Sequence, residues 1–285
     1  MHLFKRLRRV VDHNKHVQAA ACGALATLTQ ETGEDIAPWL GPTVQALAQA
    51  IATYQRKNMR SVYDAVATLS ESAGDCIQTP DVARALLPPL LQKWEAGGDA
   101  QPDLYNLLEC VTSVVMGVGL GAQEYAAPMF ARALQLTRQQ LALREQAKAN
   151  PDSDVPYEPD HVVCALDLLS GVADGMGAAC EALVSANAPA LREVIVASVS
   201  EAGGLCTNGM SNSRHSSRWA NAALVTTLDP AAVGALGHTG PMAGVGLQRE
   251  LERRFFDAGG GTYAAPAQRA SDFLRGERSS GDLRT

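Results

Sequence analysis

Four stretches of this chain share one pattern, in which small and aliphatic residues run into a terminal glycine. They read ACGALATLTQETG, YDAVATLSESAG, LECVTSVVMGVG and LDLLSGVADGMG, and they end at Gly33, Gly74, Gly119 and Gly177. The intervals between these glycines are 41, 45 and 58 residues. Each stretch has the apolar spacing of a helix, and an apolar helical segment follows each glycine. Since one helix pair cannot bury its apolar face alone, the pattern predicts stacked pairs with a shared elongated core.

The repeat length and the composition together predict an all-α fold. Periods of about 40 to 47 residues with two helices each are typical of HEAT and armadillo arrays. The chain is 46% hydrophobic but only 5% aromatic, as expected of closely packed helices rich in Ala, Leu and Val. We therefore expect a HEAT-repeat α-α superhelix, or solenoid, with a concave surface. The predicted helix pairs are residues 13–33 with 36–54, 58–74 with 80–96, 103–119 with 124–147, and 161–177 with 181–201.

The sequence changes in character near residue 202. Residues 203–285 are rich in Gly, Ser, Asn and Pro, and they carry no sustained apolar helical stripe. We expect two parts: a solenoid segment of about four helix pairs in residues 1–202, and a disordered, low-order tail in residues 203–285.

The stretch LLPPLLQKW, residues 86–94, places Leu87, Leu90, Leu91 and Trp94 at helical spacing. We expect Pro88 and Pro89 in the first turn of a helix, where a missing amide hydrogen costs nothing. Two roles remain open for Trp94: it packs in the core, or it forms an exposed platform that anchors a partner.

Charge and hydropathy narrow the functional classes. With 30 Asp and Glu against 24 Lys and Arg, the net charge of -6 disfavours direct binding to nucleic acid and suits a basic partner. Five acidic residues lie on the first helices of successive pairs, and ordinary helix solubility explains them better than a designed acidic stripe: Asp64, Glu71, Glu109, Asp167 and Asp174. No run of eighteen apolar residues and no signal peptide is apparent, so we expect an intracellular chain without membrane insertion.

Side chains that could perform chemistry are scattered along the chain. The six cysteines are spread singly, which favours buried reduced thiols over disulfides or zinc. His13 and His16 could share a helical face, but no third ligand is spaced to join them. We therefore expect no catalytic, cofactor-binding or metal-binding residue, and no enzyme.

Several motifs, taken in order and spacing, closely resemble the transportin, or karyopherin beta-2, family of nuclear import receptors. They are NKHVQAAACGALATL, YQRKN, YDAVATL, LLPPLLQKW, LLEC and ALDLLSG. The similarity runs from about Val11 to about Ser200. From about Gly203 the sequence no longer follows the family, as if the reading frame or the gene model had left the coding path.

The resemblance implies a function in nuclear import. It implies that the chain, like members of this family, binds cargo that carries a basic or proline-tyrosine nuclear localisation signal. It also implies that Ran in its GTP form releases the cargo. It implies that Trp94 and Leu91 contact cargo, and helical geometry adds Leu87 one turn earlier. It further implies Ran and nuclear pore proteins as partners, and a location in cytoplasm and nucleus. The alternative is a structural HEAT scaffold without transport activity, in which Trp94 is a core residue.

Overall fold

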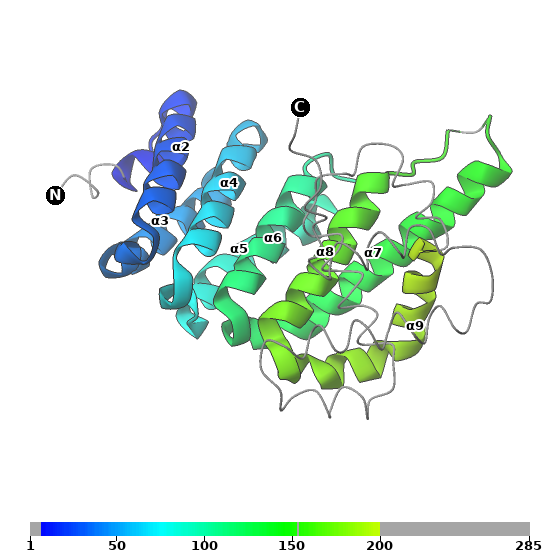
Figure 1. Ribbon diagram of the computed structural model, residues 1–285. Coiled ribbons are helices and arrows are strands. Elements are labelled where there is room, and N and C mark those ends of the chain that lie inside the picture. The colour runs from blue at the N-terminus through cyan, green and yellow to red at the C-terminus, as the bar shows by residue number, and fades with distance from the viewer. Residues whose placement is uncertain (1–6, 153, 200–285) are drawn as a thin grey trace, which may run out of the picture. The chain divides into compact units, whose positions relative to one another are not determined.

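The computed structural model describes residues 7–152 and 154–199, in which every regular element is a helix (Figure 1). The α-helices are α2 (Lys15–Thr32), α3 (Leu40–Thr53), α4 (Arg56–Ser72), α5 (Pro80–Gly97), α6 (Leu104–Val118), α7 (Gln123–Ala149), α8 (Pro159–Met176) and α9 (Glu181–Val199). The predicted all-α repeat fold is confirmed. The predicted tail, residues 203–285, lies outside the described residues.

The glycine at the end of each repeated stretch stops a helix. All four glycines have positive φ angles, which residues with a side chain rarely adopt: Gly33 at 54°, Gly74 at 57°, Gly119 at 57° and Gly177 at 51°. A short 3-10 helix begins at each of them: η1 (Gly33–Trp39), η2 (Gly74–Ile77), η3 (Gly119–Ala122) and η4 (Gly177–Cys180). A glycine reaches this left-handed region at low cost, which explains why one stands at the end of each stretch.

The helices pack in two layers, and their pairing differs from the prediction. One layer contains α2, α4, α6 and α8, each in contact with the next (Figure 1). Across the layers, α3 packs on α4, α5 on α6 and α7 on α8. The predicted pairs instead joined α2 with α3, and α4 with α5. The stronger contacts therefore join the second helix of one predicted pair to the first helix of the next.

Helix α5 contains the proline pair in its interior. It begins at Pro80, and the Thr79 side chain accepts a hydrogen bond from the Val82 amide at 3.3 Å. Pro88 and Pro89 therefore lie more than two turns into the helix, so the prediction that they occupy a first turn is wrong. Each removes one backbone hydrogen bond. Burial of Leu86, Leu87 and Leu90 on both sides of the pair offsets this loss.

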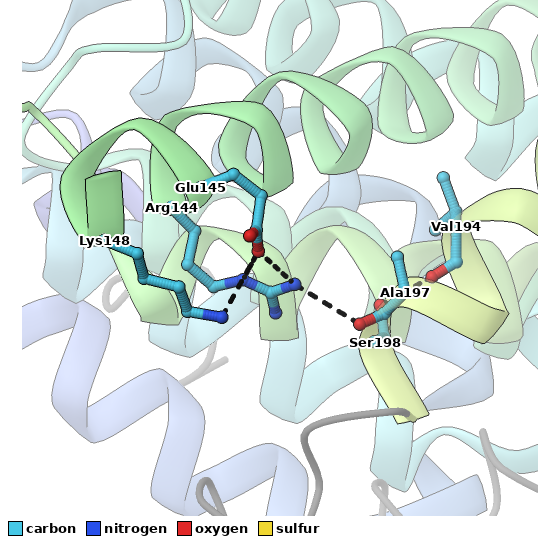
Figure 2. A network of polar contacts seen from close by, with 6 residues as sticks. All are labelled: Arg144, Glu145, Lys148, Val194, Ala197 and Ser198. Atoms are coloured by element: carbon cyan, nitrogen blue, oxygen red, sulfur yellow. Dashed lines mark hydrogen bonds and ion pairs between the residues drawn. The ribbon is translucent and has the colours of Figure 1, made fainter.

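Helix α9 is held on α7 by two guanidinium groups, the exposed Arg138, which pairs with Glu193 at 3.3 Å, and the nearly buried Arg144. The Arg144 side chain is 10% exposed, and its Nη2 donates to the Ala197 carbonyl oxygen at 3.3 Å. Glu145 pairs with Arg144 at 3.2 Å and with Lys148 at 3.3 Å, so the cations are held around one carboxylate (Figure 2). A cation at the carbonyl end of a helix also interacts favourably with the helix dipole.

Two stretches, Leu104–Ala149 and Pro159–Leu191, are long and apolar enough to cross a membrane by length and composition alone. This differs from the expectation that no such stretch exists. Half of the most apolar window of each stretch is buried inside the protein, and each stretch contains a 3-10 turn at a glycine. Core helices of a two-layer stack have the same apolar composition, because they are covered by neighbours on more than one side.

Candidate functional site

Two of the three predicted cargo contacts are covered completely. Trp94 and Leu87 have 0% of their surface exposed, whereas Leu91 is half-buried against the core. Of the two roles left open for Trp94, burial of its indole favours core packing over an exposed platform. Of the three residues, Leu91 alone presents surface to a ligand.

Asp99 and Arg132 form a polar cluster at the C-terminal end of α5, and this cluster covers Trp94. Its indole Nε1 donates to Asp99 Oδ1 at 2.7 Å, which satisfies the one polar group of the ring. The Arg132 guanidinium lies over the ring at 4.2 Å from its centroid and donates to the same Asp99 oxygen at 3.1 Å. Arg132 also donates to the Trp94 carbonyl oxygen at 3.0 Å. The cluster fastens α7 to the end of α5 and leaves no indole surface for a ligand.

The layer formed by α2, α4, α6 and α8 carries a row of acidic side chains on its exposed surface. Asp64, Glu109 and Asp167 each stand ten residues before the terminal glycine of their helix, so they occupy equivalent positions in α4, α6 and α8. Glu71 and Asp174 each stand three residues before that glycine, two helical turns further along. All five are exposed except Asp167, which is half-buried. We call these five residues the carboxylate row.

Close packing of the layer brings the members of the carboxylate row together. A Cβ atom on Gly117 would lie 2.5 Å from the Ser70 carbonyl oxygen, and one on Gly175 would lie 2.6 Å from that of Val115. Only glycine allows the backbones of α4, α6 and α8 to approach in this way. Contacts between helices follow: the Ser113 hydroxyl of α6 donates to Glu71 Oε1 of α4 at 2.8 Å.

These carboxylates raise the pKa values of two buried thiols. Burial raises the pKa of Cys110, and the carboxylates of Asp64, Glu71 and Glu109 raise it further. Burial likewise raises the pKa of Cys164 to about 12, with Asp167 and Glu109 adding to the effect. Glu109 acts on both thiols, which agrees with its middle position. Carboxylates from α4, α6 and α8 therefore act on buried thiols of two neighbouring helices.

The cysteines behave as packing residues. Cys22, Cys110, Cys164 and Cys180 are buried free thiols, and Cys76 is half-buried, so the prediction of unpaired buried thiols is confirmed for these. Cys206 lies outside the described residues. His13 and His16 are both exposed, and within residues 7–152 and 154–199 no three potential metal ligands come together.

The register of the carboxylate row is hard to see in the sequence, because each helix alone has only one or two of the five acidic residues. The alignment of the repeats contains the signal. Three acidic residues lie ten positions before their terminal glycine, and two lie three positions before it. Alignment of the repeats on their glycines would have placed them in a row.

Comparison with known proteins gives relatives for the helical part of the chain. It is 41% identical over 191 residues to transportin-1 from Oryza sativa subsp. japonica, which covers 67% of this chain and 21% of that protein. It is 40% identical over 179 residues to human transportin-1, covering 63% and 20% of the two chains. Importin subunit beta-2 from Schizosaccharomyces pombe is 39% identical over 189 residues, covering 66% and 21%. The chain thus spans about a fifth of the length of these curated relatives.

The C-terminal part has relatives of another kind. Residues 193–284 match a family model described as FAD-dependent protein, C-terminal domain-like. The chain is also 40% identical over 82 residues to an uncharacterised protein from Clostridium beijerinckii, a match that covers 29% of this chain and 15% of that protein. The match to a protein family argues against an out-of-frame reading after Gly203, and a gene model that leaves the family's coding path there stays a prediction. Most of the matched residues lie outside the described part of the structure.

Proposed function

The helical part of this chain is a homologue of one stretch of transportin and importin subunit beta-2, and we propose that it binds nuclear import cargo. The ligand is the basic part of a localisation signal of the basic or proline-tyrosine type. It binds in extended form along the carboxylate row on α4, α6 and α8. No covalent step is involved, and residues 1–202 act as the binding unit.

The register of Asp64, Glu109 and Asp167 across three neighbouring helices is the observation that carries this proposal. Packed helices lie about 8 to 10 Å apart, and an extended peptide advances about 3.3 Å per residue. A carboxylate on each helix can therefore meet about every third residue of a basic peptide. Several weak contacts of this kind supply affinity and orientation to a segment that is disordered before it binds.

The three residues predicted as cargo contacts take different parts in this proposal. Leu91 has exposed surface and remains a candidate apolar contact for the signal. Leu87 and Trp94, which have 0% exposure, hold α5 in place against its neighbours. Substitution of Trp94 then changes binding through folding and has no direct effect on the contact surface.

The remaining parts of an import cycle come from the resemblance. Release by Ran, contact with nuclear pore proteins and movement between cytoplasm and nucleus are part of the proposal for the whole receptor, and no described residue is assigned to them. A HEAT scaffold without transport activity is the other candidate. No feature of the described residues favours it over cargo binding.

Fluorescence anisotropy with a labelled peptide tests the proposal. The peptide carries a basic segment followed by Arg-x5-Pro-Tyr. The test variant combines Asp64→Asn, Glu109→Gln and Asp167→Asn. At about 0.5 to 1 kcal/mol for each exposed charge pair, we expect the dissociation constant to rise by roughly tenfold to a hundredfold.

A second triple variant controls for net charge. Asp81→Asn, Glu95→Gln and Glu124→Gln remove three exposed carboxylates from α5 and α7 in the other layer. We expect the dissociation constant of this variant to lie within about threefold of that of the unmodified protein. Any change within that range comes from the loss of long-range charge attraction. Equal weakening in both variants would show non-specific attraction. Absence of peptide binding by the folded protein would favour the scaffold.

A further inference from the structure

A small cavity lies between helix ends and is lined by no member of the carboxylate row. Its volume is about 430 Å³, in the range of pockets that hold small ligands. It is formed by the end of α3, the start of α4, the end of α5 and the segment that leads into α6. The lining residues are Tyr54, Arg56, Met59, Tyr63, Lys93, Ala96, Gly97, Gln101, Pro102 and Asp103.

Hydrogen-bond donors outnumber acceptors among the charged and amide groups of this cavity. The one carboxylate, Asp103, is already paired, since its Oδ2 accepts from Arg56 Nε at 2.7 Å. The other guanidinium nitrogens of Arg56 have no protein partner within the described residues, nor does the half-buried Lys93 ammonium. Gln101 Nε2 is buried without any hydrogen-bond partner. A buried donor without a partner is costly, and a ligand acceptor would remove that cost.

The backbone at the start of α4 adds to this donor surface. Arg56 is the first residue of that helix, and the preceding residue, Gln55, makes no side-chain capping hydrogen bond. The first turn has no acidic side chain, so its partial positive charge is not offset locally. Lys57 and Arg60, both exposed, extend the positive charge along the same helix. The cavity therefore favours a ligand with negative charge.

The other walls of the cavity are apolar and rigid. Tyr54, Met59 and Tyr63 are each 4% exposed, and so are fixed in the core. The Tyr54 hydroxyl donates to the Val10 carbonyl oxygen and contacts Cys22 Sγ at 3.4 Å, which leaves its ring as an apolar wall. Pro102 and Ala96 add further carbon surface. Such walls select a ligand in which the charged group is attached to an apolar body.

We propose that this cavity binds an oxyanion carried on an aromatic body, of the aryl phosphate class. The oxyanion accepts hydrogen bonds from Arg56, Lys93 and Gln101, and the ring packs against the exposed carbon surface of Ala96 and Pro102. The same chemistry occurs in a free small molecule and in a phosphorylated tyrosine of a peptide. The proposal is independent of cargo binding, because it uses no member of the carboxylate row.

Isothermal titration calorimetry of the full chain with phenyl phosphate tests the site. We expect saturable binding at one site, weakened about fivefold to tenfold in Lys93→Gln, the loss typical of one charge-assisted hydrogen bond. Gln101→Glu, which places a negative charge at the unpaired donor, should abolish binding. Arg84→Gln removes an exposed cation from α5 outside the cavity and should leave binding unchanged. Circular dichroism checks that every variant keeps its helices.

Two further ligands separate the parts of the proposal. Inorganic phosphate should bind at least about tenfold more weakly than phenyl phosphate, since it lacks the ring that packs on the apolar walls. A Gly-Gly-phosphotyrosine-Gly peptide that binds as well as phenyl phosphate would identify a peptide-borne group, and exclusion of this peptide would identify a free small molecule. No saturable binding of phenyl phosphate, or equal loss in Lys93→Gln and Arg84→Gln, would overturn the proposal.

Discussion

Trp94 shows how far a single residue can be interpreted from its sequence neighbours. Helical spacing correctly placed it on the same apolar stripe as Leu87 and Leu90. Spacing could not show that Asp99 and Arg132 cover the ring, because Arg132 lies 38 residues away in another helix. An amphipathic side chain at a helix end can face either water or a partner helix. Only the tertiary contacts decide between these positions.

Replacement of Trp94 by alanine should reduce stability far more than it alters the binding surface. We expect Trp94→Ala to lower the free energy of unfolding by about 3 to 5 kcal/mol, because it leaves a cavity and removes the indole's hydrogen bond to Asp99 and its contact with the Arg132 guanidinium. Urea unfolding followed by circular dichroism measures this. Leu120→Ala, at a residue that is 61% exposed, should change stability by less than about 0.5 kcal/mol. A loss at Trp94 as small as that at Leu120 would contradict its role in the core.

The buried thiols predict a fall in stability at alkaline pH. Burial raises the pKa of Cys164 to about 12 from 9.0, and the pKa of Cys110 is raised as well. The unfolded chain therefore releases thiol protons from about pH 9 upward, while the folded chain retains them. Their stabilising contribution is complete below pH 9 and is lost as the pH rises toward 12.

We expect the urea midpoint to fall between pH 8 and pH 10, and the fall to be shallower in a Cys110→Ala, Cys164→Ala variant. The unmodified protein and the variant are compared at each pH, so that the cost of the substitutions themselves cancels. An identical pH dependence in the two proteins would show that these thiols titrate alike in the folded and unfolded chains.

At the scale of elements, the helical fold and the ends of four helices could be predicted. The contacts between helices could not. The terminal glycines correctly predicted where α2, α4, α6 and α8 stop, since a positive φ angle favours glycine. The proline pair was misplaced because local propensity disfavours proline inside a helix, and burial of the flanking leucines outweighs that preference. Pairing depends on contacts between layers, which sequence periodicity does not record.

Glycines at the close helix contacts should tolerate no side chain. In Gly117→Ala the new Cβ would meet the Ser70 carbonyl oxygen at 2.5 Å, so α4 and α6 must move apart. We expect a loss of about 1 to 3 kcal/mol in the free energy of unfolding. Gly23→Ala, where no atom lies within 4 Å, should gain up to about 1 kcal/mol through helix propensity. Equal effects of the two substitutions would argue against close packing of the layer.

At the scale of the whole molecule, the two parts of the chain are similar to different proteins. The helical part is homologous to about a fifth of transportin-1, whereas residues 193–284 match a family described as FAD-dependent protein, C-terminal domain-like. The change near residue 202 was visible as a change of composition, but similarity to a second family could not be inferred from composition. The candidate binding surface lies entirely in the helical part.

The position of a bound peptide tests the central claim most directly. A basic peptide that carries a benzophenone group beside its charged segment is bound to the full chain and cross-linked by light, and the attached residues are identified by mass spectrometry. We predict cross-links on the exposed surfaces of α4, α6 and α8, next to Asp64, Glu109 and Asp167. Cross-links concentrated on α3, α5 or α7 would contradict the claim that the carboxylate row binds the cargo signal.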